Sequence, residues 1–523
     1  MLISLVLSIS GAGAAAVPAA PASQDCARIL QPDAQAGSPR PISDHDLIET
    51  LDLGPNAAME SGSFFTLSPD NQRVAVGVRR ASVAGDSYCT GITLVDRDGN
   101  SALIDSGPGV AFFRFEDFYG TNGFPSGITQ LITPRWSGDG KRLAYLKFID
   151  GRLQLRLWDE QLNARAIGAD PQDIVDFRFS RDGSMIIYKV RDGSAQATAL
   201  RRESRSGLHY DDRYFPFASA WPFPGGHPAY VYKAVRISDG DIRAASDEEK
   251  ALLTAPIEES QTTKGVLATT VRDDKGLDHI TAGPAGKENR CESSACTEVE
   301  GAPWFSSKGA VRYVRREGWA KNEMAIYEWK VGSAEPHRLY ATSDLLIDCK
   351  PIDDDVLCGR EGPTHPRYLS RIDLRTGKSV PLFDPNPTFG TLKFGNVERQ
   401  LWRNDQGIEC FGDLVYPPDY QPGRRYPLIV VQYESRGFLR GGTGDEYPVQ
   451  LFARAGYLVL NVQRPRSPLY GLGLSSIERQ RRQNDGFMER RSILSAIETK
   501  VRQLIDAGVA DPERIGITGL SDG

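Results

Sequence analysis

The fold is decided by the stretch RIGITGLSDG, residues 514–523. Its last five residues form a G-x-S-x-G motif centred on Ser521. A serine in this motif lies on a sharp strand-to-helix turn that exposes its hydroxyl, and the glycines leave room for the crowded backbone. Alone the motif is common, but here a helical segment, an Asp511-Pro512 turn and a short apolar strand precede it. This context predicts that Ser521 is a nucleophile, and the alternative is an incidental surface serine.

The residues before this motif alternate between strand-like and helix-like patterns. Apolar runs at 426–433 and 457–462 have the length of buried strands, and 407–416 is another strand-like run. Residues 492–507 carry apolar side chains at helical spacing, and 514–518 is a short strand. Strands separated by helices are typical of a parallel sheet, so this part is predicted to be an α/β domain.

A repeated phrase fills residues 45–385: an aromatic or apolar strand end, a polar turn and an apolar strand. Its turns lie at 68–71, 137–140, 180–183 and 306–309. An Asp-Asn or Asp-Gly tip in the first three turns supplies the positive φ of a tight hairpin. Successive turns are 69, 43 and 126 residues apart, and 126 is three times 42. A period of this length is typical of a four-stranded propeller blade, and the span of 69 predicts one insertion.

We therefore expect a β-propeller of roughly seven blades followed by a partial α/β-hydrolase domain. A β-sandwich or a tandem of small β domains is the alternative for the first part. The expected domains are a signal peptide at 1–22, an N-terminal segment at 23–44, the propeller at 45–388 and the N-terminal half of the hydrolase domain at 389–523.

The first residues have the composition of an export signal. Residues 2–9 are an apolar run, and 11–23 consist almost entirely of small residues and proline, with a cleavage site expected near Ala22. No Lys or Arg precedes the apolar run, so the usual basic start is missing. No later stretch has transmembrane length. The expected location is periplasmic or secreted, without a membrane anchor.

The bulk composition is that of a soluble chain with two or three domains. The 523 residues are 40% hydrophobic and 25% charged, with a formal net charge of -6. This mild acidity argues against a nucleic-acid partner, which would require a basic face. The basic run at 479–491 is interpreted as a solvated helix face.

The seven cysteines fit an oxidising compartment. Their spacing suggests disulfides between Cys291 and Cys296, between Cys349 and Cys358, and between the more distant Cys26 and Cys89, which leaves Cys410 as a buried thiol. Metal binding is not expected, because the pairs lack C-x-x-C spacing and nearby histidines. We expect no cofactor.

Acyl transfer also requires donors for the developing oxyanion. One expected donor is the backbone N–H of Asp522, the residue after the nucleophile. The second is the hydroxyl of Tyr433, because open α/β sheets place their sites at the carboxyl ends of strands. A packed core tyrosine is the alternative for Tyr433. The carboxylate of Asp522 is expected to serve in packing or helix capping.

The general base is missing from the residues available. The six histidines lie outside the α/β segment, and none follows Ser521; they are His45, His209, His227, His279, His337 and His365. In α/β-hydrolases the order is Ser, then Asp or Glu, then His. Both partners are therefore expected beyond Gly523, and we expect the fragment of 523 residues to be inactive by itself.

The predicted architecture and two motifs resemble the prolyl oligopeptidase family of serine peptidases. Residues 511–521 are similar to that family's approach to the nucleophile, and Tyr433 matches its oxyanion tyrosine. Residues 432–448 and the Ser-Asp-Gly of the motif are more closely similar to the bacterial lasso peptide isopeptidases. That resemblance covers nearly all of the chain after the signal peptide.

The resemblance implies hydrolysis of the isopeptide bond that joins a peptide's N-terminal amine to an Asp or Glu side chain. Ser521 would form the acyl-enzyme, and the propeller would hold the small peptide and exclude bulky proteins. Arg436 and Arg440 are candidates for binding substrate carbonyls or carboxylates. Salt bridges between this loop and the propeller are the alternative for both arginines.

Two other functions stay open at this stage. A dipeptidyl peptidase or oligopeptidase would act on linear peptides, and a dipeptidyl peptidase needs paired carboxylates for a free ammonium. The candidate pairs, Glu248-Glu249 and Glu258-Glu259, lie in polar stretches where solvated side chains are expected. The other alternative is a periplasmic propeller that only binds a ligand and carries a degenerate hydrolase remnant.

Overall fold

The computed structural model describes most of the chain. The described residues are 25–33, 38–54, 62–115, 124–214, 222–223, 229–254, 266–273, 276–284, 286–439 and 448–519. Several predictions fall outside these ranges: the signal peptide, His227, Glu258-Glu259, Arg440, Ser521 and Asp522.

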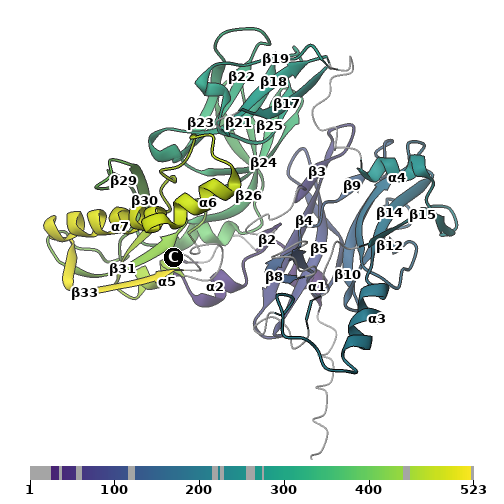
Figure 1. Cartoon of the computed structure of the whole chain (residues 1–523), viewed down its shortest axis with the longest axis horizontal. Coiled ribbons are helices and arrows are strands. Elements are labelled where there is room, and N and C mark those ends of the chain that lie inside the picture. Colours follow the sequence, from purple (N-terminus) through teal and green to yellow (C-terminus); the bar gives the residue numbers. More distant parts are fainter. Residues whose placement is uncertain are drawn as a thin grey trace, which may run out of the picture.

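Six antiparallel sheets of three to five strands occupy the described residues from Asp52 to Phe383 (Figure 1). The first sheet contains β2 (Asp52–Leu53), β3 (Phe65–Leu67), β4 (Arg73–Ser82), β5 (Ser87–Asp96) and β6 (Ser101–Pro108). The second contains β9 (Arg135–Trp136), β10 (Arg142–Ile149), β11 (Arg152–Asp159) and β12 (Arg165–Ala166). The third contains β13 (Ile174–Phe179), β14 (Met185–Asp192), β15 (Ala229–Arg236) and β16 (Ile242–Ala244).

The remaining three sheets follow in chain order. The fourth contains β17 (Leu267–Arg272), β18 (Asp278–Gly283) and β19 (Asn289–Arg290). The fifth contains β20 (Val299–Phe305), β21 (Val311–Glu317), β22 (Glu323–Trp329) and β23 (His337–Thr342). The sixth contains β24 (Leu345–Ile352), β25 (Asp355–Gly362), β26 (His365–Asp373) and β27 (Lys378–Phe383).

The repeated turns connect strands as the sequence predicts. Each lies between one strand of a sheet and the longer or equally long strand that follows it, and its tip has positive φ: 57° at Asn71, 69° at Gly140, 70° at Gly183 and 78° at Gly309. In the third turn the Ser180 hydroxyl donates to the Asp182 carboxylate over 2.6 Å. This and further hydrogen bonds lower the pKa of Asp182 to about 2, so the turn keeps its acceptor charged.

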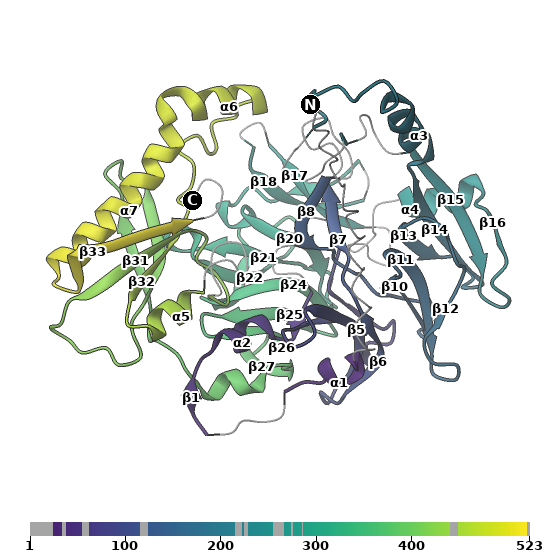
Figure 2. The same ribbon diagram turned by 90° about the horizontal axis from the view of Figure 1, so that it is seen from below.

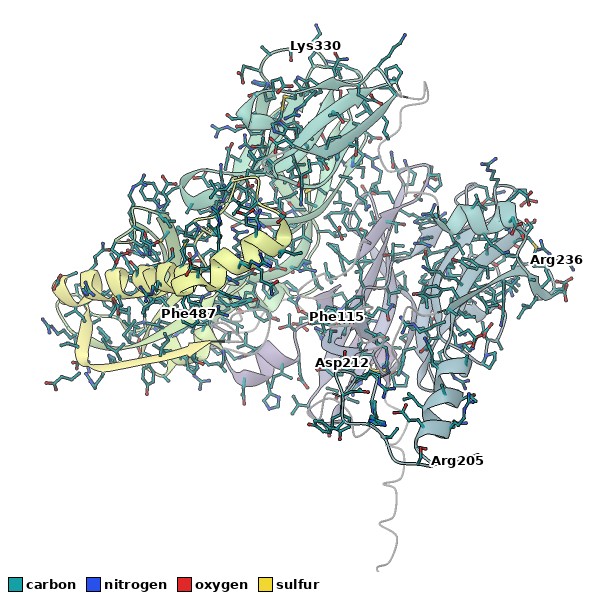
Figure 3. The ribbon with its side chains drawn as sticks, in the orientation of Figure 1. Phe115, Arg205, Asp212, Arg236, Lys330 and Phe487 are labelled. Carbon is teal, nitrogen blue, oxygen red and sulfur yellow. A yellow bond between two sulfur atoms is a disulfide. The ribbon has the colours of Figure 1, made fainter. Side chains whose placement is uncertain are left out.

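Insertions explain where the spacing departs from the 42-residue period. The span of 69 residues contains the hairpin of β7 (Phe112–Phe115) and β8 (Phe124–Thr129), which is the predicted insertion. The span of 126 holds two sheets in the described residues, with α3 (Ser194–Glu203) and α4 (Asp247–Thr254) between strands. Arg205 and Arg236, labelled in Figure 3, lie on the outer side of this region, away from the α/β sheet. The count of seven blades stays a prediction.

The first and sixth sheets pack against each other although they are far apart in sequence. The Phe64 N–H donates to a carboxylate oxygen of Asp348 over 3.0 Å, and Arg367 donates to the Leu53 carbonyl over 2.7 Å. The two sheets also share one hydrophobic core, which includes Leu53, Phe64, Phe65, Val76, Leu357, Leu369 and Phe383. The first and the last of the six sheets are therefore neighbours in space.

Three disulfides stabilise the N-terminal sheets. They join Cys26 to Cys89, Cys291 to Cys296 and Cys349 to Cys358, while Cys410 is a buried free thiol. These are the pairs that the spacing suggested. Burial raises the pKa of the Cys410 thiol to about 11, which makes it a poor nucleophile.

The C-terminal part is an α/β sheet with strand order β29-β30-β32-β31-β33. Its strands are β29 (Val397–Arg403), β30 (Glu409–Val415), β31 (Tyr426–Tyr433), β32 (Leu458–Gln463) and β33 (Ala510–Gly519). Strand β31 is parallel to β32 and β33, as expected for this domain class. β33 is longer than the strand predicted at 514–518. Its pairing with β31 begins at Ala510, opposite Tyr426, and a register shift follows before Ile515 pairs with Leu428.

Helices cover both faces of this sheet (Figures 1 and 2). α7 (Met488–Asp506) packs its predicted apolar side, including Ile493 and Ile497, against Leu428 and Val430 of β31. α5 (Val449–Arg454) packs on the opposite face, and α6 (Ser476–Asn484) precedes α7. No helix among the described residues is long and apolar enough to cross a membrane.

The remaining elements are short. They are α1 (Cys26–Ile29), α2 (Asp44–Ile48), β1 (Arg40–Pro41), β28 (Leu392–Lys393), and the 3-10 turns η1 (Ser294–Cys296), η2 (Trp319–Lys321), η3 (Pro387–Thr391) and η4 (Asp485–Phe487). β1 pairs with β28, and the α2 region packs with η3, so the N-terminal residues lie against the α/β part.

Candidate active site

The candidate site lies at the carboxyl edge of the α/β sheet. In the parallel pairing of β31 with β33, Gly519 lies opposite Gln432, the residue before Tyr433. Ser521 follows Gly519 by two residues but lies outside the described residues. Figure 2 shows β33 running towards the N-terminal sheets. Parallel strands end at one edge, which is where α/β folds place their active sites.

Tyr433 is the last residue of β31 and is partly exposed. Its carbonyl accepts the N–H of Arg464 over 3.0 Å, which fixes the backbone where the strand ends. Within the described residues the Tyr433 hydroxyl makes no hydrogen bond, so it can donate to a ligand. These features fit the sequence prediction of an oxyanion donor, which remains a prediction because the nucleophile is not described.

A buried polar network holds the segment after Tyr433. The Ser435 hydroxyl donates to Asp413 over 2.7 Å and accepts the Asp413 backbone N–H over 3.2 Å. The Ser435 N–H donates to the Gln463 side chain over 3.1 Å. Arg399 binds both oxygens of Asp413, over 2.7 and 3.1 Å. Ser435 and Asp413 are 0% and 1% exposed, so solvent does not compete for these bonds.

Arg436 carries a guanidinium that has no acidic partner among the described residues. It lies over the Phe411 ring at 5.8 Å, and its buried Nε lacks a hydrogen-bond acceptor. Burial, together with the nearby Arg316, lowers the pKa of Arg436 to about 10. By contrast, Arg316 itself is paired with Glu300 at 2.5 Å.

A cavity of about 1380 Å³ extends from this edge between the N-terminal sheets. It is lined by residues of β3, β9, β13, β20 and β24, which belong to five different sheets, and by Glu434, which follows Tyr433. Charged lining side chains of both signs include Arg135, Arg178, Glu300, Arg316, Asp348 and Arg367. The cavity is larger than the usual small-molecule site, so it suits a peptide.

The other candidate groups of the sequence lie elsewhere. Glu249 pairs with Arg243 at 2.7 Å, and Glu248 accepts the Ser246 hydroxyl, so both carboxylates belong to the surface of α4. Neither is among the residues that line the cavity. Glu248 is exposed, as expected, whereas the Glu249 side chain is 17% exposed and is held by Arg243.

The described histidines belong to the part of the chain before the α/β sheet. His279 contacts Asp273 at 3.0 Å, and His365 contacts Asp384 at 3.1 Å. Within the described ranges, no group of three His, Cys, Asp or Glu side chains is arranged to hold a metal ion.

Sequence reasoning missed the network of Ser435, Asp413 and Arg399. The available signal was Asp413 inside the apolar run of β30, because a buried carboxylate needs a partner. Its partners lie on other strands and loops, which the sequence pattern does not identify.

Antiparallel sheets ahead of an α/β sheet, with the candidate residues at one strand edge, are the arrangement expected of a serine peptidase of the prolyl oligopeptidase type. No protein-family model matches the chain. The chain is 35% identical over 496 residues to the lasso peptide isopeptidase AtxE2 of Asticcacaulis excentricus, covering 92% of this chain and 71% of the relative. It therefore belongs to the lasso peptide isopeptidase family.

Solved structures of AtxE2 agree with this family assignment. AtxE2 without ligand has a TM-score of 0.86 at 34% identity, and this match covers 92% of our chain and 76% of that one. A serine-to-alanine variant of AtxE2 with Astexin3-dC4 bound also has a TM-score of 0.86, at 33% identity with the same coverage. The acylaminoacyl peptidase of Pyrococcus horikoshii has a TM-score of 0.54 at 18% identity, covers 91% of our chain and 74% of its own, and shows the fold alone.

Proposed function

We propose that this protein is a serine isopeptidase that hydrolyses the macrolactam bond of a lasso peptide. The observation that carries the proposal is the 35% identity to the AtxE2 isopeptidase over 92% of the chain. The position of Gly519 opposite Gln432 supports it, because the nucleophile and the Tyr433 hydroxyl then belong to one strand edge.

The proposed reaction is acyl transfer. The Ser521 hydroxyl attacks the side-chain carbonyl of the Asp or Glu that closes the peptide ring, and its proton passes to the general base. The Tyr433 hydroxyl and the Asp522 N–H donate to the oxyanion. The carbon–nitrogen bond then breaks, and the nitrogen leaves, protonated, as the peptide's free N-terminal amine. Water then hydrolyses the ester with the help of the general base.

We propose that the six sheets are blades of a propeller that holds the substrate. Two observations support this: strands from five of the sheets line one cavity, and the first and sixth sheets share a core. A cavity of about 1380 Å³ beside Glu434 admits a small peptide, while the surrounding sheets exclude folded proteins. The proposed domain boundaries are 45–388 for the propeller and 389–523 for the hydrolase part.

Arg436 is proposed to bind a carbonyl or carboxylate of the peptide, together with Arg440. The support is electrostatic. A half-buried guanidinium without a carboxylate partner binds a ligand's negative charge more strongly than a guanidinium that already has such a partner. Its neighbours Arg316 and Arg399 already have carboxylate partners. The proposed location is periplasmic or secreted, which three disulfides support because such bonds persist in oxidising compartments.

The test is a comparison of threaded and linear substrates with the full-length protein. Mass spectrometry should show that the lasso peptide gains one water and becomes linear, and a Ser521→Ala variant should show no change. Equal or faster cleavage of linear peptides would assign the protein to the oligopeptidases. Binding without turnover of any peptide would assign it to the ligand-binding modules.

A further inference from the structure

Ser435 lies two residues beyond Tyr433 and has no freedom to rotate. Its hydroxyl gives its one proton to Asp413 over 2.7 Å and accepts the Asp413 N–H over 3.2 Å. Its own N–H is held by Gln463 over 3.1 Å. With the Tyr433 carbonyl bonded to Arg464, the backbone is fixed on both sides of Glu434.

Asp413 is itself fixed by a cation that comes from a third strand. Arg399 of β29 forms two hydrogen bonds with this carboxylate, and the Arg399 guanidinium lies 4.9 Å from the centre of the Phe411 ring. A carboxylate that is 1% exposed requires such a partner, because an unpaired buried charge is strongly destabilising. Ser435 therefore contacts a rigid acceptor.

The network also reaches the N-terminal sheets. Arg399 Nη1 donates to the Asn322 backbone and side-chain oxygens, over 3.3 Å each. Asn322 follows the turn η2, whose Trp319 indole donates to the Cys410 carbonyl of β30 over 2.9 Å. Ala320 and Lys321 in this turn have positive φ values of 47° and 61°, a conformation that persists only where surrounding contacts hold it.

We propose that Ser435 and Asp413 are positioning residues that hold the Tyr433 hydroxyl at the oxyanion, and that Arg399 links this position to the 318–322 turn of the N-terminal sheets. The proposal rests on the proposed function, since it assumes that Tyr433 is an oxyanion donor. Ser435 and Asp413 make and break no bonds in the reaction and act only by placing the Tyr433 hydroxyl. A donor displaced by about 1 Å loses much of its stabilisation of the transition state.

The readout is the rate at which a fluorophosphonate probe labels Ser521 in the full-length protein. This adduct places a phosphoryl oxygen where the substrate oxyanion would lie, so the rate depends on the oxyanion donors and not on the natural substrate. Wild-type protein should be labelled and a Ser521→Ala variant should not. Absence of labelling in the wild type would remove the proposed function, and this proposal with it.

A double-mutant cycle separates positioning from general stability. Ser435→Ala should lower the labelling rate about 10-fold, and Tyr433→Phe should lower it by at least as much. Because Ser435 acts through the Tyr433 hydroxyl, the double variant should match Tyr433→Phe alone. Additive losses, or no loss in Ser435→Ala while Tyr433→Phe is impaired, would overturn the proposal and leave the proposed function intact.

Ser370→Ala is the matched control. Ser370 is also 0% exposed and its hydroxyl also bonds another side chain, that of Ser379 at 2.6 Å, but it belongs to the sixth sheet. Its labelling rate should equal that of the wild type. Asn322→Ala tests the link to the N-terminal sheets. This substitution leaves the ion pair of Arg399 with Asp413 in place and needs no new packing. A slower labelling rate is expected, and an unchanged labelling rate would refute that link.

Discussion

Arg367 donates a hydrogen bond of 2.7 Å to the carbonyl oxygen of Leu53, across 314 residues of sequence. The same guanidinium pairs with Glu361 at 2.8 Å, and Glu361 also accepts the N–H of Phe438 over 3.2 Å. One arginine therefore connects the first sheet to the sixth, and through Glu361 to the loop after Tyr433. The contact between the first and sixth sheets and the placement of the loop after Tyr433 therefore involve the same side chain.

Arg367→Met should destabilise the protein by about 3 kcal/mol, because it leaves the Glu361 carboxylate, which is 14% exposed, without its cation. The measurement is the free energy of unfolding in urea. Arg375→Met is the control, since that arginine side chain is 86% exposed and its nearest carboxylate lies 3.7 Å away. Its effect should stay within about 0.5 kcal/mol. Equal effects of the two substitutions would contradict the stabilising role of this contact between the first and sixth sheets.

Tyr433→Phe should lower kcat for the lasso peptide about 100-fold or more, with little change in KM, because the lost donor acts in the transition state. Steady-state kinetics on the full-length protein measures both constants. Tyr457→Phe is the control, because that tyrosine is 38% exposed and precedes β32. A change confined to KM would instead indicate that Tyr433 only binds the substrate.

The disulfides should contribute different amounts to the free energy of unfolding. The Cys26–Cys89 bond spans 63 residues and Cys291–Cys296 spans 5. Since loop closure restricts the unfolded chain more for a longer loop, replacing the first pair by serine should cost about 2 kcal/mol more than replacing the second. Urea unfolding of both double variants measures this difference. The opposite order would show that native contacts outweigh loop entropy.

Arg436 can be tested together with the substrate. If it binds a peptide carboxylate, then Arg436→Met and conversion of that carboxylate to an amide should each weaken binding, and the two losses should not add. Peptides with an amidated acidic side chain or an amidated C-terminus identify which carboxylate it is. Binding to the Ser521→Ala variant avoids turnover during the titration. Additive losses with every peptide would leave Arg436 as a partner of backbone carbonyls.

Local patterns predicted the local structure well. The turn phrases are short-range signals, and their positive φ values appear at Asn71, Gly140 and Gly183 as expected. The bounds of β31 agree with the apolar run at 426–433, because a fully buried strand needs such a run. Cysteine spacing likewise suggested the three disulfides.

Contacts between residues far apart in the sequence were harder to predict from the sequence. The 42-residue period suggested three units between Ser180 and Ser306, whereas the described residues place two sheets there, since α3 leaves the sheet and lengthens one unit. Ser435, Asp413 and Arg399 come from two strands and a loop, so only the register of β29 with β30 and the path after β31 bring them together. A polar residue in an apolar run signals that a partner exists without identifying it.

The most direct test is the mass of the covalent intermediate on Ser521. Attack on a macrolactam opens the ring but leaves the released amine attached to the same peptide, so the acyl-enzyme carries the whole peptide. Rapid quenching and intact-protein mass spectrometry of full-length protein with a lasso peptide should therefore show an increase equal to the full peptide mass, absent in Ser521→Ala. An increase equal to only part of the peptide, or the same adduct in Ser521→Ala, would contradict the isopeptidase assignment.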